Sequence, residues 1–114
     1  MTAAVGEFRS VWTYLNRTPH ALRTVEARGV RTRYLEAGYP SNPVLILLHG
    51  TAGSLENFCA NYEALSRDYH VLGLDLLGCG YTDKPDFDYQ ISDYAAHVRD
   101  FMDALGISEA SLIG

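Results

Sequence analysis

Apolar residues follow two different patterns along the chain. Residues 21–29 and 30–38 alternate in part between apolar and polar positions and each ends at a glycine, which predicts a pair of half-exposed antiparallel strands. From Val44 to Leu48 every residue is apolar, which indicates a strand covered on both faces, as in a parallel sheet. A second buried strand is expected over residues 69–74, and a third over residues 110–113.

Helical spacing appears between these strands. Ser54 can cap a helix in which apolar residues recur every three or four positions up to Leu65. We expect a longer helix to begin at Ser92 and to end at Gly106. Its apolar stripe consists of Ile91, Tyr94, Ala95, Val98, Phe101, Met102 and Leu105. The order strand, helix, strand, helix, strand predicts an α/β fold with a doubly wound, mostly parallel sheet.

The first 20 residues have a different character. Phe8, Val11, Trp12 and Leu15 lie at near-helical spacing, which predicts a short amphipathic arm over residues 1–20. Such an arm packs either on the main domain or on a partner subunit, so a homo-oligomer is compatible with the sequence. The rest of the chain is expected to form one core domain or part of one, because 114 residues that are 47% hydrophobic can bury a core.

Composition narrows the function classes. No stretch approaches the roughly 20 apolar residues of a membrane span, and the N-terminus lacks the features of a secretory signal, so we expect a cytoplasmic protein without a membrane partner. Cys59 and Cys79 match neither a metal-ligand pair nor a disulfide framework, and we interpret them as free buried thiols. We expect no metal and no cofactor.

The net charge of −5 is unevenly distributed. Residues 1–33 contain six arginines and two acidic residues, whereas the remainder contains three basic and twelve acidic residues. Because the arginines are scattered rather than clustered, we interpret them as a solvated or subunit-facing surface and expect no nucleic-acid partner.

The first candidate motif for chemistry is His49–Ser54, which follows the first buried strand. Open α/β sheets bind ligands at the carboxyl ends of their strands. A glycine-containing turn there can direct the backbone N–H of Thr51 or Ala52 into a cleft, where it would stabilise a developing oxyanion. The alternative is that these glycines serve the turn alone.

The second motif is Asp75–Pro85, again at the carboxyl end of a buried strand. Gly78 and Gly80 permit tight turns and a close backbone approach. We expect Asp75 to accept hydrogen bonds from loop amides rather than to act as a nucleophile.

The third motif is Ser111–Gly114, a short apolar strand that reaches a glycine. Together the three motifs resemble the α/β-hydrolase family over residues 21–114. The resemblance implies that this chain forms the N-terminal half of the core domain and that Gly114 is the first glycine of a G-x-S-x-G nucleophile elbow, with the nucleophile two residues later.

A narrower resemblance comes from WTYL in the arm followed by VRTRYLEAG, which is similar to the meta-cleavage-product hydrolases. These enzymes cleave a carbon–carbon bond in a 2-hydroxy-6-oxo-dienoate formed by aromatic ring cleavage, and their Ser-His-Asp triad acts after ketonisation of the dienol. The resemblance implies an oxyanion donor at Thr51 or Ala52, with further substrate-binding positions in the same segment. These positions are His49, Gly50, Gly53 and Asn57.

Two departures bear on this reading. Thr51 and Ala52 stand where several relatives have glycine or serine, so the choice of donor between them stays open. The loop also lacks the proline that follows H-G-x in epoxide hydrolases and dehalogenases, which argues against those two classes. A carboxylesterase would share every motif, and a non-catalytic hydrolase-like binding protein is the alternative from another class.

The remaining histidines are expected to have no catalytic role. His20 follows a turn proline, His70 begins a strand, and His97 is expected on the polar side of the long helix. The resemblance places the acid, the base and the lid further along the polypeptide.

We therefore expect a partner that supplies the C-terminal remainder of the same fold. Either the sequence is a piece of a longer polypeptide, or cleavage after Gly114 leaves two associated chains. The strain of an elbow turn makes cleavage there plausible, and the end of the sequence at the expected elbow glycine favours this second interpretation. The other expected ligand is a small-molecule substrate.

Overall fold

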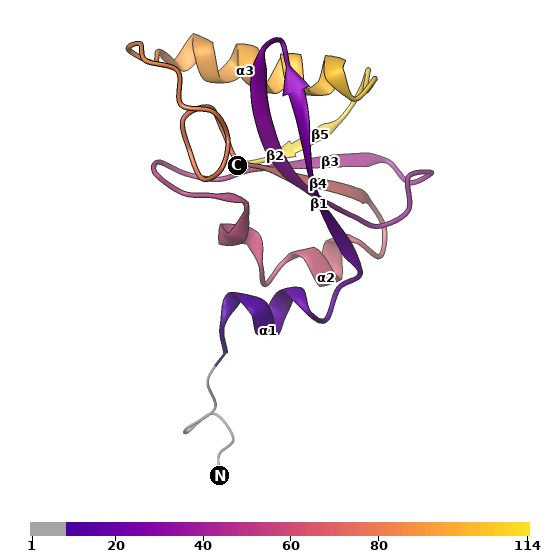
Figure 1. The fold of residues 1–114 in the computed structure, drawn as a ribbon. Coiled ribbons are helices and arrows are strands. Elements are labelled where there is room, and N and C mark those ends of the chain that lie inside the picture. The colour runs from indigo at the N-terminus through magenta and orange to yellow at the C-terminus, as the bar shows by residue number, and fades with distance from the viewer. Residues whose placement is uncertain (1–8) are drawn as a thin grey trace.

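The computed structural model describes residues 9–114, which form a five-stranded sheet with helices on both faces (Figure 1). Phe8, which the sequence assigned to the arm, lies outside the described residues. The helix α1 (Val11–Leu15) begins after Ser10, whose hydroxyl accepts a hydrogen bond from the backbone N–H of Thr13. Buried Leu15 attaches this helix to the core of the domain.

A hairpin forms one edge of the sheet, as the sequence predicts. The strands β1 (His20–Ala27) and β2 (Val30–Ala37) are antiparallel, with Ala27 opposite Val30. Arg28 and Gly29 form the turn with φ values of 47° and 86°, as a two-residue hairpin turn that matches the strand twist requires.

The remaining strands are β3 (Val44–Leu48), β4 (His70–Leu74) and β5 (Ser111–Ile113), and the spatial order is β1-β2-β4-β3-β5. β3 is parallel to both β4 and β5, whereas β2 is antiparallel to β4. β1, β3, β4 and β5 therefore run in one direction and only β2 runs in the other, so the sheet is mostly parallel, as predicted. The carboxyl ends of β3, β4 and β5 lie at the same edge of this sheet.

Side chains of the sheet alternate between two apolar layers. Leu45 and Leu47 face the layer beneath α1 and the segment 55–65, whereas Ile46 faces the layer that contains Phe101 of the long helix. Figure 1 shows these helices on opposite sides of the sheet. The continuous apolar run of β3 is explained by burial on both faces.

The helix that we predicted over residues 54–65 is broken into two pieces. A 3-10 helix, η1 (Leu55–Phe58), precedes α2 (Tyr62–Leu65). The backbone N–H of Leu55 donates to Asp75, and its carbonyl accepts a hydrogen bond from the Tyr62 hydroxyl. In a continuous helix the Leu55 carbonyl would accept from the Cys59 N–H, but here it accepts from the Tyr62 hydroxyl, and the Cys59 N–H donates to the Glu56 carbonyl instead. Helical spacing alone does not reveal this tertiary hydrogen bond.

The long helix α3 (Ile91–Ala104) begins one residue earlier than we predicted. Gln90 is its N-cap, and the carboxylate of Asp93 accepts from the Gln90 backbone N–H at 2.8 Å, so Ser92 is not the cap. Gly106 follows the helix with φ of 71°, as expected. Ile91 is 88% exposed and Ala95 is exposed too, so neither belongs to a buried stripe as we predicted.

The strand β5 differs from the predicted buried strand. Leu112 is 55% exposed and Ile113 is 41% exposed, because β5 pairs only with β3 within residues 9–114.

Among residues 9–114, even the longest helix, α3 with 14 residues, falls short of what a membrane-spanning helix requires.

Candidate active site

The loop after β3 presents two free backbone donors. The Gly53 N–H donates to the Gly50 carbonyl at 3.0 Å, which closes a turn with Thr51 and Ala52 at its centre. Both central residues are exposed, and their N–H groups have no hydrogen-bond acceptor among residues 9–114. The turn therefore leaves these two backbone N–H groups free to donate to an atom outside residues 9–114.

A cavity of about 360 Å³ adjoins this turn, at the carboxyl ends of β3 and β4. It is lined by His49, Gly50, Thr51, Ala52, Leu76, Cys79, Ile91 and Tyr94. Four of the six predicted site residues thus share one cavity, and the other four lining residues add an apolar and aromatic wall. Leu76 and Cys79 belong to the Asp75–Pro85 motif; Cys79 is free, as interpreted, but only partly buried. The sequence did not single out Ile91 or Tyr94 as site residues, because the topology alone brings the start of α3 to this loop.

Gly53 and Asn57, the other two predicted substrate-binding residues, do not line the cavity. The side-chain oxygen of Asn57 accepts a hydrogen bond from the Ser54 backbone N–H at 2.9 Å and so caps η1. A contact of either residue with substrate stays a prediction.

His49 joins the turn to the next loop. Its Nε2 accepts a hydrogen bond from the Leu76 backbone N–H at 3.0 Å, and its Nδ1 lies 2.7 Å from the Gly50 carbonyl oxygen. Only a neutral ring with its hydrogen on Nδ1 satisfies both bonds. The buried imidazole thereby fixes the start of the turn relative to the end of β4.

Asp75 accepts hydrogen bonds from loop amides, as the sequence predicts. Its carboxylate receives the backbone N–H of Leu55 at 2.8 Å and that of Tyr81 at 2.9 Å, and the residue has no exposed surface. Gly80 is required beside it, because its φ is 53° and a Cβ at this position would collide with the Asp75 carboxylate. One buried carboxylate thus holds both loops that border the cavity.

Arg33 contradicts the interpretation of the early arginines as a solvated or subunit-facing surface. Its guanidinium contacts both Asp75 and Glu56, and its side chain is only 13% exposed. Burial alone would lower the pKa of Arg33, but the hydrogen bonds with the two carboxylates raise it. Likewise, burial would raise the pKa of Glu56, yet the Arg33 hydrogen bond lowers it. No spacing in the sequence connects Arg33 to Asp75, 42 residues later.

His97 is buried rather than on the polar side of α3, which corrects our sequence interpretation. The Leu77 backbone N–H donates to its Nδ1 at 3.1 Å. The Thr32 hydroxyl lies 2.9 Å from its Nε2 and donates to the Val30 carbonyl, so Nε2 carries the hydrogen. A neutral His97 therefore ties α3 to β2 and to the loop after β4.

This burial predicts a pH-dependent stability. Burial lowers the pKa of His97 from its ordinary value of 6.5, and nearby Asp100 opposes the shift in part. In the unfolded state the ring takes up a proton near pH 6.5. The folded state takes up this proton only at a lower pH, so the free energy of unfolding should fall as the pH drops below about 6.5. Urea denaturation between pH 7.5 and 5 should show a shallower fall in the free energy of unfolding for His97→Gln than for the control His20→Gln, because His20 is partly exposed. Equal slopes would contradict the assignment.

Ala52 predicts a second measurable effect. Its φ of 57° is a left-handed conformation that alanine adopts at a cost and glycine adopts freely. We expect Ala52→Gly to raise the free energy of unfolding by about 0.5–1 kcal/mol. Ala60→Gly is the matched control, because Ala60 is also exposed but has no positive φ, and it should be neutral or destabilising. A destabilised Ala52→Gly variant would contradict the strain at this position.

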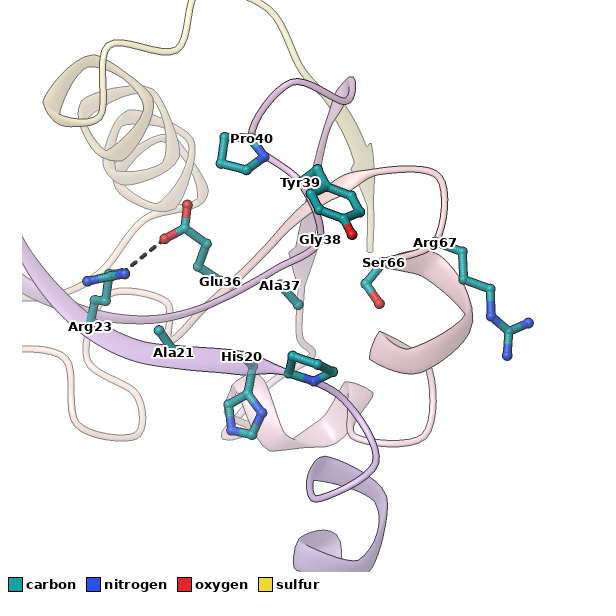
Figure 2. A pocket seen from close by; sticks show the side chains of 11 residues that line it. His20, Ala21, Arg23, Glu36, Ala37, Gly38, Tyr39, Pro40, Ser66 and Arg67 are labelled. Carbon is teal, nitrogen blue, oxygen red and sulfur yellow. Dashed lines mark hydrogen bonds and ion pairs between the residues drawn. The ribbon is translucent and has the colours of Figure 1, made fainter.

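A larger cavity, of about 550 Å³, lies at the opposite end of the parallel strands (Figure 2). It is bordered by the start of β1, the end of β2 and the segment after α2, and Arg23 and Glu36 form an ion pair of 3.0 Å at its side. None of the predicted site residues lines this cavity. The smaller cavity at the carboxyl ends of β3 and β4 is therefore the candidate active site.

Comparisons with known proteins agree with this geometry. The chain is 40% identical over 95 residues to the 2-hydroxy-6-oxo-6-(2'-aminophenyl)hexa-2,4-dienoic acid hydrolase of Metapseudomonas resinovorans, a match that covers 81% of this chain and 32% of the relative. The chain spans about a third of the length of the curated relatives that it matches.

Solved structures with the same fold include two hydrolases. A serine hydrolase involved in carbazole degradation has a TM-score of 0.76 and 38% identity, over 84% of this chain and 38% of that chain. A membrane phospholipase A has a TM-score of 0.83 and 30% identity, over 87% and 32%. The family model for the alpha/beta hydrolase fold matches residues 43–114, which include the turn, the Asp75 loop and β5. The chain therefore belongs to the α/β-hydrolase fold family.

Proposed function

We propose that this chain is part of a serine-type hydrolase that cleaves a carbon–carbon bond in a 2-hydroxy-6-oxo-dienoate-like product of aromatic ring cleavage. The observation that carries the proposal is the 40% identity to a dienoic acid hydrolase over 81% of the chain. The carbazole-degradation serine hydrolase, at 38% identity, supports the same class.

The geometry near Gly114 supports a nucleophile next to the turn. β5 is parallel to β3, with Ile113 beside Leu47, and a Cβ on Gly114 would lie 3.8 Å from the Leu48 carbonyl oxygen. Gly114 thus lies beside the residue that precedes His49. A serine two positions later in the full-length protein would come close to the free amides of Thr51 and Ala52.

In the proposed reaction the dienol first ketonises, and a general base in the rest of the fold takes the hydroxyl proton of that serine as its oxygen bonds to the ketone carbon next to the scissile bond. When the carbonyl double bond re-forms, the carbon–carbon bond breaks, its electron pair passes to the other fragment, which takes up a proton, and water then releases the acyl group from the serine. Before this collapse the electrons of the carbonyl double bond lie on the carbonyl oxygen, which carries negative charge. The N–H of Thr51 or Ala52 donates to this oxygen and stabilises the charge as it develops. Leu76, Ile91 and Tyr94 offer an apolar wall that suits the hydrocarbon side group of the substrate. His49 keeps the turn in place through its bond to the Leu76 N–H.

An esterase is the second candidate function. The TM-score of 0.83 with a membrane phospholipase A favours it, and oxyanion stabilisation by the same amides would serve ester cleavage equally. A hydrolase-like binding protein would keep the cavity but lack the nucleophile.

We also propose that the partner of this chain is the C-terminal remainder of the same fold, in one polypeptide or as a second associated chain of roughly 150 to 180 residues. The unpaired side of β5 and the exposed Leu112 and Ile113 offer it an edge and an apolar surface. Denaturing mass spectrometry of the natively purified protein distinguishes the two forms. A monomeric 114-residue protein that unfolds cooperatively would contradict the need for any partner.

The function is tested on the protein purified from its source with everything that copurifies. A 2-hydroxy-6-oxo-6-phenylhexa-2,4-dienoate should lose its visible absorbance, and a fluorophosphonate that labels active serines should abolish the reaction. Turnover of aryl esters without turnover of the dienoate would favour the esterase. Turnover of neither, together with no fluorophosphonate labelling, would favour the binding protein.

A further inference from the structure

We propose that Arg33, at the centre of β2, is a positioning residue for the candidate active site: it holds the turn before η1 and the loop after β4 at the spacing that oxyanion stabilisation requires. This inference rests on the proposed hydrolase function, although one of its tests does not need activity. Arg33 does not line the cavity, so its side chain can act on the cavity only through the residues that it contacts, which are Asp75, Glu56 and Tyr81.

The guanidinium makes a fork with each of two carboxylates. Its Nε donates to Asp75 Oδ2 at 2.8 Å and its Nη2 to Asp75 Oδ1 at 3.3 Å. Its Nη1 donates to Glu56 Oε2 at 3.0 Å, and Nη2 also reaches Glu56 Oε1. Only a planar group with several donors in fixed directions can satisfy both carboxylates at once.

The two carboxylates belong to the two loops that border the cavity. Glu56 lies in η1, directly after the turn, and also accepts a hydrogen bond from the Ser54 hydroxyl at 2.9 Å. Asp75 follows β4 and receives the backbone N–H groups of Leu55 and Tyr81. Arg33 is thus the shared cation between the segment that starts η1 and the segment that follows β4.

Charge and packing explain why a rigid cation is needed. Two carboxylates in a mostly buried place repel each other unless a cation lies between them. The ring of Tyr81 covers the guanidinium, with its centroid 4.6 Å from the Arg33 Cζ, which adds a cation–π contact from the second loop. β2 is paired on both sides, so the base of the Arg33 side chain is fixed by the sheet.

The test compares Arg33→Lys with Arg23→Lys in the natively purified protein. Lysine keeps the charge but donates from a single point, so it cannot form both forks. Arg23 is the matched control, because it also lies in the hairpin and pairs with one glutamate but contacts neither loop. We expect kcat per fluorophosphonate-titrated site to fall about 10-fold or more for Arg33→Lys, with KM changed less than about 3-fold. Aryl ester is assayed beside the dienoate, so that failure of the proposed substrate class is separated from failure of this inference.

A second readout is amide hydrogen exchange, which is independent of turnover. The Leu55 and Tyr81 amides should exchange faster in Arg33→Lys, whereas amides in residues 97–104 of α3 should not change. The inference would be overturned if hydrogen exchange of the two loop amides were unchanged, or if exchange in residues 97–104 of α3 accelerated equally. It would also be overturned if kcat per titrated site were unchanged in a protein that turns over either substrate. Loop-specific acceleration in Arg33→Lys but not in Arg23→Lys supports it.

Discussion

Replacing Asp75 by alanine should lower the free energy of unfolding by about 3–5 kcal/mol, because it removes one partner of a buried ion pair. Arg33 would then retain only Glu56, and the backbone N–H groups of Leu55 and Tyr81 would lose their acceptor. Buried donors without an acceptor carry their full desolvation cost. Urea denaturation of the natively purified protein at pH 7 measures the change.

Two variants serve as controls for this result. Asp75→Asn keeps a side-chain oxygen for one loop amide but loses the charge opposite Arg33, so its loss should be smaller than that of alanine. Asp68→Ala removes a carboxylate from an exposed position and should change stability by less than about 0.5 kcal/mol. A loss below about 1 kcal/mol for Asp75→Ala would show that the carboxylate does not organise the two loops.

The elements that the sequence predicts well are those whose local pattern and tertiary surroundings agree. The hairpin has alternating strands and a glycine in its turn, and the structure places Arg28 and Gly29 there with positive φ. The apolar run of β3 needs burial on both faces, and both layers exist. The role of Asp75 follows the same logic, since a carboxylate at the end of a buried strand needs donors, and adjacent loops contain free amides.

The errors arise where long-range hydrogen bonds override local spacing. Residues 55–65 have helical spacing, yet the Leu55 carbonyl accepts from the Tyr62 hydroxyl rather than from the Cys59 N–H, and the helix is interrupted. His97 was predicted on the solvent-exposed side of α3 because its side chain is polar. It is buried instead, because Thr32 and the Leu77 N–H form hydrogen bonds with its two ring nitrogens. Arg33 is the clearest case, since its partners lie 23 and 42 residues further along the chain. Ile91 and Tyr94, which also line the candidate site, could not be assigned to it before the topology was known.

The candidate site itself could be predicted only in part. The position of His49–Gly53 after a buried strand indicated where a cleft would open, and the turn is found there. Its side chains gave no information on which amide points toward the cleft, because that direction depends on backbone torsion angles. The structure leaves both Thr51 and Ala52 without an acceptor within residues 9–114, so an experiment must choose between them.

The variant Thr51→Pro tests whether the Thr51 amide or the Ala52 amide is the oxyanion donor. Proline removes the N–H of residue 51 and suits the first central position of a turn, while Ala52 keeps its positive φ at the second. If the Thr51 amide is the oxyanion donor, kcat per titrated active site should fall ~100-fold or more, as is typical when one such donor is lost. The Gly53–Gly50 hydrogen bond does not involve this N–H, so the fold should be retained.

Thr51→Ala is the matched control, because it removes the hydroxyl and keeps the N–H. Its kcat per titrated site should stay within a few-fold of the original protein, and circular dichroism should show the same secondary structure in both variants. A normal rate for Thr51→Pro would assign the donor role to the Ala52 amide or to a donor elsewhere. A proline at position 52 cannot test the Ala52 amide, because its ring excludes a φ of 57°. Equal losses in Thr51→Pro and Thr51→Ala would instead identify the hydroxyl, not the backbone, as the group that matters at position 51.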